Sequence, residues 1–249
     1  MSFSDHFSGV SSAYAEFRPR YPDSLFQWLV ELPGGRNLAW DCATGSGQAA
    51  VALALRFERV IATDASAEQI AAAAPHPSVD YRVAPAEASG IEPESVDLVT
   101  VAQALHWLDR PAFFAETRRV LRTDGALAAW SYGNPRLDEA RADEVLWRFT
   151  SETVGPHWPP ERALVDAGYR TIEFPFVEID PPAFEMETQW PLSALLGYIG
   201  TWSATTRFRA ARGYDPLPEL AAQLQRFWGD PETPRRIEWP LALRVGRPP

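Results

Sequence analysis

LAWDCATGSGQ, residues 38–48, is a short apolar run that carries one acid and then breaks into small residues with two glycines. Residues 49–55, AAVALAL, are apolar throughout. This order predicts a buried parallel strand, a tight loop and a helix packed on a sheet. Gly45 and Gly47 tolerate positive φ angles and let a ligand approach the backbone, and amides at the helix start would point at that ligand. We therefore expect a nucleotide-type cofactor at this turn.

Two cofactors compete for the turn. Residues 45–50, GSGQAA, satisfy the G-x-G-x-x-A fingerprint of NAD sites, which is a weak signal alone. Asp41 disfavours NAD, because a carboxylate at the strand end would face the anionic pyrophosphate. S-adenosylmethionine has no phosphate and carries an ammonium and a sulfonium, so the acid favours it and leaves an NAD-dependent dehydrogenase as the lesser alternative. An ordinary turn with a capping Asp leaves the paired glycines unexplained.

Composition limits the classes of function. The chain has 249 residues, 46% hydrophobic and 22% charged, which suits one globular domain (1–249) with an insertion. Its formal net charge of −10 makes a nucleic-acid partner unexpected. All basic side chains are arginine, which excludes lysine-based covalent catalysis. Cys42 is the single cysteine, so we expect no disulfide framework and no Cys-based metal site, and we assign no residue as a metal ligand.

The apolar pattern also gives expectations about location. Residues 1–6 lack the basic and apolar regions of a secretion signal, and no stretch is apolar for long enough to span a bilayer. We expect a cytoplasmic monomer or homodimer that acts on a small-molecule acceptor, with no membrane partner.

Strand and helix patterns alternate along the chain. After the first strand, the apolar runs predict strands at 60–63, 79–83, 95–101, 126–132, 171–177 and 237–245. A helix beginning at Asp109 or Arg110 is expected to run to Asp124-Gly125. The predicted fold class is α/β, a doubly wound, seven-stranded, mostly parallel Rossmann-like sheet with a mainly helical insertion between the last two strands. Prolines inside those two strands predict edge positions or bulges.

Ligands of doubly wound sheets collect at the carboxyl ends of the strands. Asp64 ends the second strand, where an acid can accept both ribose hydroxyls. Ala86 and Glu87 follow the third strand and should lie beside an adenine ring. The segment after the fourth strand holds Gln103, which we expect to contact the cofactor, and then His106 and Trp107. A His-Trp pair at this position has a packing role as often as a chemical one.

Aromatic residues and arginines crowd the segment before the first strand. They are His6, Phe7, Tyr14, Phe17, Arg18, Arg20 and Tyr21. A flap over the cofactor, with Arg18 near its carboxylate, and simple packing on the domain edge are equally good interpretations. We therefore set residues 1–35 apart as a flap with a first helix, and residues 36–133 as the cofactor-binding core.

A second aromatic-rich segment lies between the last two predicted strands. Residues 186–234 contain Trp190, Tyr198, Trp202, Phe208, Tyr214, Phe227 and Trp228. A satellite core is the simple explanation. We favour a lid that forms the acceptor pocket, because large aromatics facing a cofactor cleft suit a binding site.

The order of these motifs resembles the class I S-adenosylmethionine-dependent methyltransferases over nearly the whole chain. The general motifs are DCATGSG (41–47), ATDAS (62–66) and RVLRTDGAL (119–127). A narrower likeness, to the small-molecule branch that includes trans-aconitate methyltransferase-like proteins, rests on Tyr14, Arg18-Pro19, Tyr21-Pro22, ALHW (104–107), FPF (174–176), TWS (201–203) and WPL (239–241). The resemblance implies cofactor contacts at Asp41, Ala43, Gly45, Gly47, Asp64 and Ala65.

Two positions depart from the family pattern. Ala43 stands where the family usually has its first motif glycine, a mild change if Ala43 keeps a negative φ angle. Pro85 replaces an acid often found two residues before Glu87 and cannot accept a hydrogen bond from the adenine amino group. Adenine contacts would then fall to the Ala86 backbone or to Glu87.

Methyl transfer from a sulfonium mainly requires that donor and acceptor are aligned and water is excluded. A carboxylate acceptor needs an arginine to hold it, whereas a hydroxyl or amine acceptor needs a base, for which His106 is best placed. Trp107 is suited to wall the pocket beside the sulfonium by a cation–π contact. His106 and Trp107 are therefore the catalytic candidates. The rival from another class is a catalytically silent regulatory protein that binds S-adenosylmethionine.

Overall fold

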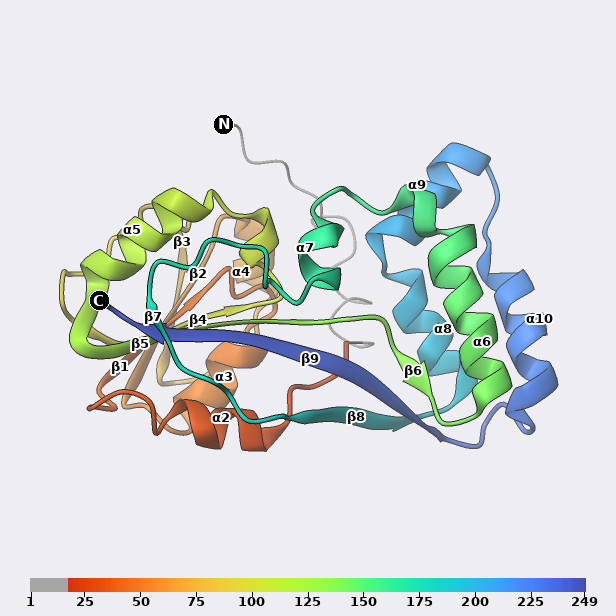
Figure 1. Cartoon of the computed structure of the whole chain (residues 1–249), viewed down its shortest axis with the longest axis horizontal. Coiled ribbons are helices and arrows are strands. Elements are labelled where there is room, and N and C mark those ends of the chain that lie inside the picture. The colour runs from red at the N-terminus through yellow and green to blue at the C-terminus, as the bar shows by residue number, and fades with distance from the viewer. Residues whose placement is uncertain (1–17) are drawn as a thin grey trace.

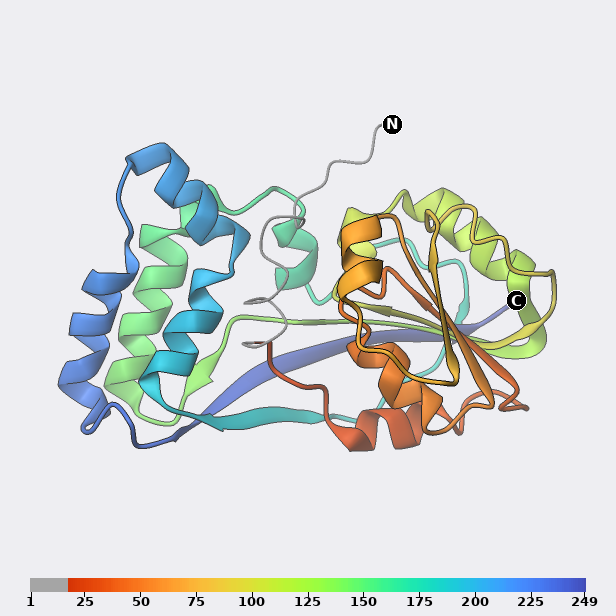
Figure 2. The same ribbon diagram turned by 180° about the vertical axis from the view of Figure 1, so that it is seen from behind.

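The computed structural model describes residues 18–249, and these form an α/β half and a helical half joined by long strands (Figures 1 and 2). The strands are β1 Leu38–Cys42, β2 Arg59–Asp64, β3 Val79–Val83, β4 Val96–Ala102, β5 Leu121–Tyr132, β6 Arg136–Leu137, β7 Val177–Glu178, β8 Glu185–Trp190 and β9 Arg235–Arg247. The helices are α2 Asp23–Leu29, α3 Gln48–Ala54, α4 Ala67–Ala72, η1 Leu105–Trp107, α5 Arg110–Val120, α6 Ala140–Arg148, η2 Phe149–Thr153, η3 Gly155–His157, α7 Arg162–Asp166, α8 Leu192–Gly200, α9 Ser203–Arg212 and α10 Leu217–Trp228. The predicted flap residues His6, Phe7, Tyr14 and Phe17 lie outside the described part of the chain.

The sheet confirms the predicted Rossmann-like fold. Its order is β3-β2-β1-β4-β5-β9-β6; the first five strands in this order are parallel, and β9 is antiparallel to β5. Alternate residues of β1 enter different cores, since Ala39 packs with α2 and α3 while Trp40 packs with α5. Helices therefore cover both faces, as in a doubly wound sheet.

The sheet of the described residues has nine strands, two more than predicted. The added strands pair with β9: β8 along its first half, and the short β6 beside Ile237 and Glu238. Residues 186–190 were expected to open a helical insertion, but they belong to β8, whose side chains alternate between exposed and covered positions. Of the two alternatives predicted for Pro240, an edge strand or a bulge, the edge strand is wrong. Pro240 lies where β9 changes neighbours, between β8 and the end of β5, and its carbonyl accepts from the amide of Gly133.

Two further element boundaries differ from the prediction. The helix that begins at Arg110 ends at Val120, because Leu121 is already a buried residue of β5 paired with Val96. Of residues 171–177, the predicted sixth strand, only Val177 lies in a strand, where it begins the short β7 that pairs with the end of β9. The amide of Phe176 donates to the carbonyl of Phe174 in a tight turn, and both rings pack against Phe114 instead of alternating across a sheet.

Aromatic packing holds the helical half together. Tyr198 from α8 makes edge contacts with Trp202 and with Trp239 of β9, and the indole nitrogen of Trp239 donates to the Tyr198 hydroxyl. Helix α6 joins this cluster, although the predicted lid range of 186–234 leaves it out. Across residues 18–249, no helix has the length and apolar character needed to cross a membrane.

Glu116 of α5 fixes the loop that carries Ala86 and Glu87. Its side chain is 8% exposed and accepts from the amide and hydroxyl of Ser89, at 2.9 and 2.5 Å, and from Arg119 at 2.7 Å. Hydrogen bonds from Arg119 and then Ser89 lower the pKa of Glu116 to about 2, against burial. The ionised carboxylate therefore supports the loop that is predicted to lie beside the adenine.

We expect Glu116→Gln to lower the free energy of unfolding by on the order of 2 kcal/mol at pH 7. Because the pKa is depressed in the folded state, this stabilisation is complete above the unfolded pKa near 4.5 and is lost as the pH falls toward 2. Urea unfolding between pH 3 and 8 measures it. The control is Glu144→Gln, which removes an exposed pair with Arg148. A deficit that stays constant down to pH 3 contradicts the assignment.

The turn between β1 and α3 requires glycine at position 47. Gly47 has φ of 81°, and a Cβ there would lie 2.3 Å from the Tyr81 hydroxyl, which donates to the carbonyl of Ala74. Gly213, at the end of α9, has φ of 77° with nothing within 4 Å. It is thus a matched control for backbone strain alone.

We expect Gly213→Ala to cost about 1–2 kcal/mol and Gly47→Ala to cost about 1 kcal/mol more, since Tyr81 must move and lose its hydrogen bond. Urea denaturation of both variants checks this difference. Equal losses would show that the tyrosine adjusts freely.

Candidate active site

The glycine loop joins the ends of β1 and β2. The amide of Thr44 donates to the carbonyl of Thr63, and the amide of Gly47 donates to the carbonyl of Thr44. Gly45 has φ of 55° and Ala43 has φ of 54°. The condition for a mild change, a negative φ at Ala43, is therefore not met: this alanine holds the left-handed conformation that glycine adopts without strain, at a cost on the order of 1 kcal/mol.

Asp41 lies beneath this loop. Its carboxylate is 1% exposed and accepts from the hydroxyls of Thr44, at 2.6 Å, and Thr100, at 2.7 Å. Burial raises the pKa of Asp41 to about 6, while these hydrogen bonds oppose the rise. The acid therefore organises the loop from below and is mostly ionised at neutral pH. Its direct contact with a ligand ammonium stays a prediction.

Asp64 ends β2 and faces the loop from the next strand. One of its oxygens accepts from the amide of Gly45 and the other from the amide of Ser66, each at 2.9 Å. The hydroxyl of Ser66 in turn caps α4 by accepting from the amide of Gln69. Each carboxylate oxygen has a second lone pair, so Asp64 can hold the loop and still accept from a ribose hydroxyl.

We call the glycine loop with the acids Asp41, Asp64 and Glu87 the acidic cradle. Its chemistry fits a cationic nucleoside. Asp41, Asp64 and Glu87 all raise the pKa of the buried Cys42 thiol, after burial itself, so the three acids converge on one region. Tyr81 closes the space beside Gly47, where a side chain would intrude. An anionic pyrophosphate would be repelled here, whereas a sulfonium or ammonium would be attracted. Ala65 and Ala86 border the same strand ends.

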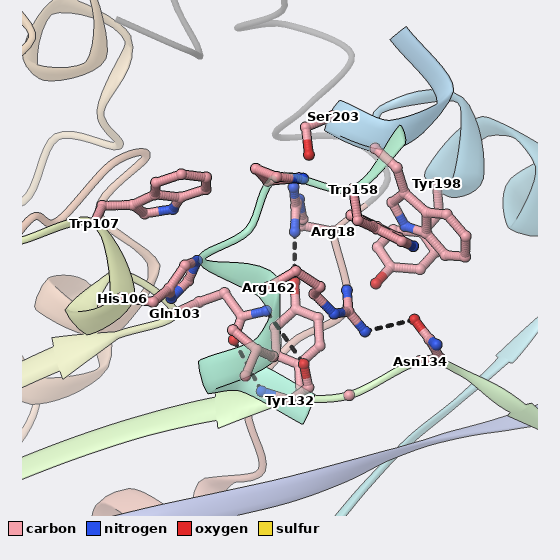
Figure 3. A pocket seen from close by; sticks show the side chains of 14 residues that line it. Arg18, Gln103, His106, Trp107, Tyr132, Asn134, Trp158, Arg162, Tyr198 and Ser203 are labelled. Carbon is pink, nitrogen blue, oxygen red and sulfur yellow. Dashed lines mark hydrogen bonds between the residues drawn. The ribbon is translucent and has the colours of Figure 1, made fainter. Parts of the chain in front are cut away.

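A pocket opens beside the cradle, between the ends of β4 and β5 and the helical half (Figure 3). Its lining residues are Arg18, Gln103, His106, Trp107, Tyr132, Gly133, Asn134, Trp158, Pro159, Arg162, Val165, Tyr198, Trp202 and Ser203. In the view of Figure 3, Arg18 and Arg162 lie between His106 and Trp107 on one side and Trp158 and Tyr198 on the other. The pocket thus combines aromatic walls with two positive charges. No cluster of potential metal ligands occurs within residues 18–249.

Gln103 ties the ends of β4 and β5 together. Its amide oxygen accepts from the Tyr132 backbone nitrogen at 2.8 Å, and its amide nitrogen donates to the Tyr132 carbonyl at 3.2 Å. Its backbone has φ of 56°, another left-handed residue at the site. Gln103 lines the pocket, and its side-chain amide is bonded to the Tyr132 backbone. Its contact with the cofactor stays a prediction.

The predicted pair His106 and Trp107 lies in η1, directly after β4. The two rings are 4.7 Å apart, and Nδ1 of His106 is 2.8 Å from the Tyr169 hydroxyl. Burial, followed by the charges of Arg162 and Arg110, lowers the pKa of His106 to about 3. His106 is therefore a neutral imidazole at physiological pH, without the ionisation near pH 6–7 that a solvent-exposed base would show.

Arg18 reaches the pocket from the N-terminal segment. Gln48, the first residue of α3, holds this segment by accepting from the Tyr21 amide and donating to the Pro19 carbonyl. Arg18 Nη1 then donates to the Tyr132 hydroxyl at 2.7 Å. This contact lies at the acceptor side of the site, so the predicted contact with the cofactor carboxylate stays untested.

Arg162 and Tyr169 were not singled out in the sequence. Arg162 opens α7, stacks on Trp158 at 4.4 Å and donates to Asn134 at 2.6 Å and Asp166 at 2.8 Å. The rigid Trp-Pro-Pro segment before α7 is the one local signal that pointed toward it. Nothing in the sequence near Tyr169 marks it as a partner of His106.

Comparisons with known proteins agree with this geometry. A family model described as a methyltransferase domain matches residues 40–129. A Dictyostelium discoideum relative, described as a proposed methyltransferase, is 36% identical over 229 residues, covering 91% of this chain and 87% of its own. A Saccharomyces cerevisiae relative, described as a proposed S-adenosylmethionine-dependent methyltransferase, is 32% identical over 149 residues, covering 56% of this chain and 51% of its own.

A solved structure shows the same fold. It is described as a proposed type II methyltransferase from Anaeromyxobacter dehalogenans, with a TM-score of 0.88, 50% identity, and coverage of 92% of this chain and 97% of its own. The likeness extends through both halves of the molecule, well beyond the matched domain. With the acidic cradle under the glycine loop, these matches show that the chain belongs to the class I S-adenosylmethionine-dependent methyltransferases.

Proposed function

We propose that this protein binds S-adenosylmethionine at the glycine loop and methylates a small molecule that carries a carboxylate. The observation that carries the proposal is the change of charge across the site. Acids line the cofactor side, at Asp41 and Asp64, and arginines line the pocket beyond His106 and Trp107. Such a division attracts a cationic donor to one side and an anionic acceptor to the other.

The residues that would hold the cofactor are those of the cradle. Asp64 accepts from the ribose, the Gly45–Gly47 turn allows close approach, and Glu87 with the Ala86 backbone lies beside the adenine. When bound, S-adenosylmethionine supplies an electrophilic methyl group on its sulfonium. The chain's own part is to orient the two reactants and exclude water.

Arg162 is the group best suited to hold the acceptor carboxylate. A guanidinium has five donors in a fixed fork, more than its bonds to Asn134 and Asp166 use. Its side chain is 14% exposed and braced by Trp158, so it meets a ligand with little loss of conformational freedom. The aromatic walls suit the apolar part of a small acid.

The state of His106 also supports a carboxylate. A carboxylate attacks without losing a proton, whereas a hydroxyl or amine must give one up. An imidazole whose pKa lies near 3 is a poor base for that task. Tyr198 and Trp202 of the helical half close the pocket, which supports the lid interpretation. The narrower likeness to trans-aconitate methyltransferase-like proteins stays a prediction.

Cofactor choice is tested by calorimetry with S-adenosylmethionine, S-adenosylhomocysteine and NAD. We expect binding of the first two, weakened by Asp64→Ala by about 1–3 kcal/mol, since a charged hydrogen bond to the ribose is lost and the loop loosens. Asp80→Ala on β3, which removes an exposed pair with Arg82, is the matched control. Tight NAD binding without S-adenosylmethionine binding would sink the proposal.

The acceptor is tested by radiolabelled methyl transfer to a panel of small carboxylic acids, with their amides, matched phenols and amines. We expect turnover of acids only, and Arg162→Gln should raise the KM for an acid about tenfold or more while leaving cofactor affinity unchanged. Arg148→Gln on α6, an exposed arginine paired with Glu144, is the control. Methylation of phenols or amines alone contradicts a carboxylate acceptor. Cofactor binding with no turnover across the panel points to a silent regulatory protein.

A further inference from the structure

Tyr169 occupies an unusual turn behind His106. Gly168 and Tyr169 follow α7 with φ of 58° and 59°, and the tyrosine ring is fully buried. A left-handed bulky residue carries strain, and it persists only where the surroundings hold it. Arg244 of β9 clamps the turn by donating to the carbonyls of Tyr169, at 2.7 Å, and Ile172. The hydroxyl is thereby fixed 2.8 Å from Nδ1 of His106.

The direction of this hydrogen bond follows from the partners of the phenol hydroxyl. The contact with Nδ1 of His106 is the one hydrogen bond of good geometry that this hydroxyl makes to a described residue. If Nδ1 carried the proton and donated it, the phenol proton would be buried without an acceptor, which costs free energy. The phenol therefore donates to Nδ1 of His106. Burial raises the pKa of Tyr169, which keeps that proton in place.

Ser131 is the competing acceptor. Its hydroxyl is buried and makes no hydrogen bond of good geometry to a described residue, although it lies close enough to influence the phenol. The phenol oxygen instead has its short contact, 2.8 Å, with Nδ1 of His106. Ser131 therefore defines the alternative that an experiment must exclude.

We propose that Tyr169 is a positioning residue that fixes His106 in the tautomer with its proton on Nε2. A neutral imidazole has one N–H, so an Nδ1 that accepts leaves Nε2 as a donor. His106 lines the pocket beside Gln103 and Trp107 (Figure 3). The N–H at Nε2 can therefore form a hydrogen bond with a methyl acceptor bound in that pocket. His106 then donates a hydrogen bond to the acceptor and has no lone pair with which to remove a proton. The consequence for the acceptor rests on the proposed function; the tautomer does not.

The tautomer is measured on the uniformly ¹⁵N-labelled protein without ligand, by long-range ¹H–¹⁵N correlation of the histidine rings. His106→Gln assigns the signal among the four histidines. We expect a protonated Nε2 and an unprotonated Nδ1, unchanged from pH 5 to 8, with Arg162, Arg110 and Tyr169 as the charged or titratable groups around the ring. A proton on Nδ1 overturns the proposal, and the tautomer itself is read from the wild-type protein.

Two variants then identify the donor. Tyr169→Phe should move both ring nitrogens toward averaged shifts of mixed tautomers, whereas Ser131→Ala should leave the spectrum unchanged. A changed spectrum in Ser131→Ala would show that the phenol donates to Ser131 and would overturn the assignment. On an acid found by the acceptor panel, Tyr169→Phe should lower kcat several-fold with cofactor affinity unchanged, and Tyr214→Phe, at an exposed ring, should match wild type. If the panel fails while the spectra hold, the proposed function falls and the tautomer stands.

Discussion

Two hydrogen bonds between the Gln103 amide and the Tyr132 backbone join the carboxyl ends of β4 and β5. From this junction the chain leaves in two directions, since η1 with His106 follows β4 and the helical half follows β5. The Tyr132 hydroxyl adds a third connection by accepting from Arg18. The elements that line the pocket are thus all connected to this one junction at the end of the sheet. A shift at this junction would displace the imidazole and an arginine together.

The cofactor side depends on a different kind of support. Asp41 and Asp64 end neighbouring strands, and both bind the loop before any ligand is present. Carboxylates that are already hydrogen-bonded need little rearrangement when a ligand arrives, which is the usual basis of preorganisation. The left-handed angles at Ala43 and Gln103 show where the backbone carries strain at the site.

The predictable features are local ones. The strand, glycine turn and helix of residues 38–55 lie within one short segment, and Asp64 lies at the end of the next strand. Hydrophobic periodicity and the glycines of the turn were therefore sufficient to predict these elements. Strand β8 and the interior place of Pro240 arise from pairing with β9 across about 50 residues, which no local pattern records. Arg162 and Tyr169 reach the site by tertiary packing against Trp158 and His106. Only the Trp-Pro-Pro segment gives a local sign of Arg162, and no local pattern marks Tyr169.

The division of charge bears on the departure of products. Under the proposed function, methyl transfer turns a sulfonium into a neutral thioether and a carboxylate into a neutral ester. The methylated acceptor therefore loses the charge that drew its precursor to Arg162, whereas the donor product loses only its sulfonium charge and keeps its ammonium near the acids around Cys42. The electrostatic field that gathers the reactants holds the ester less strongly than the acid from which it forms. The reaction itself thus weakens the attraction that brought the acceptor into the pocket.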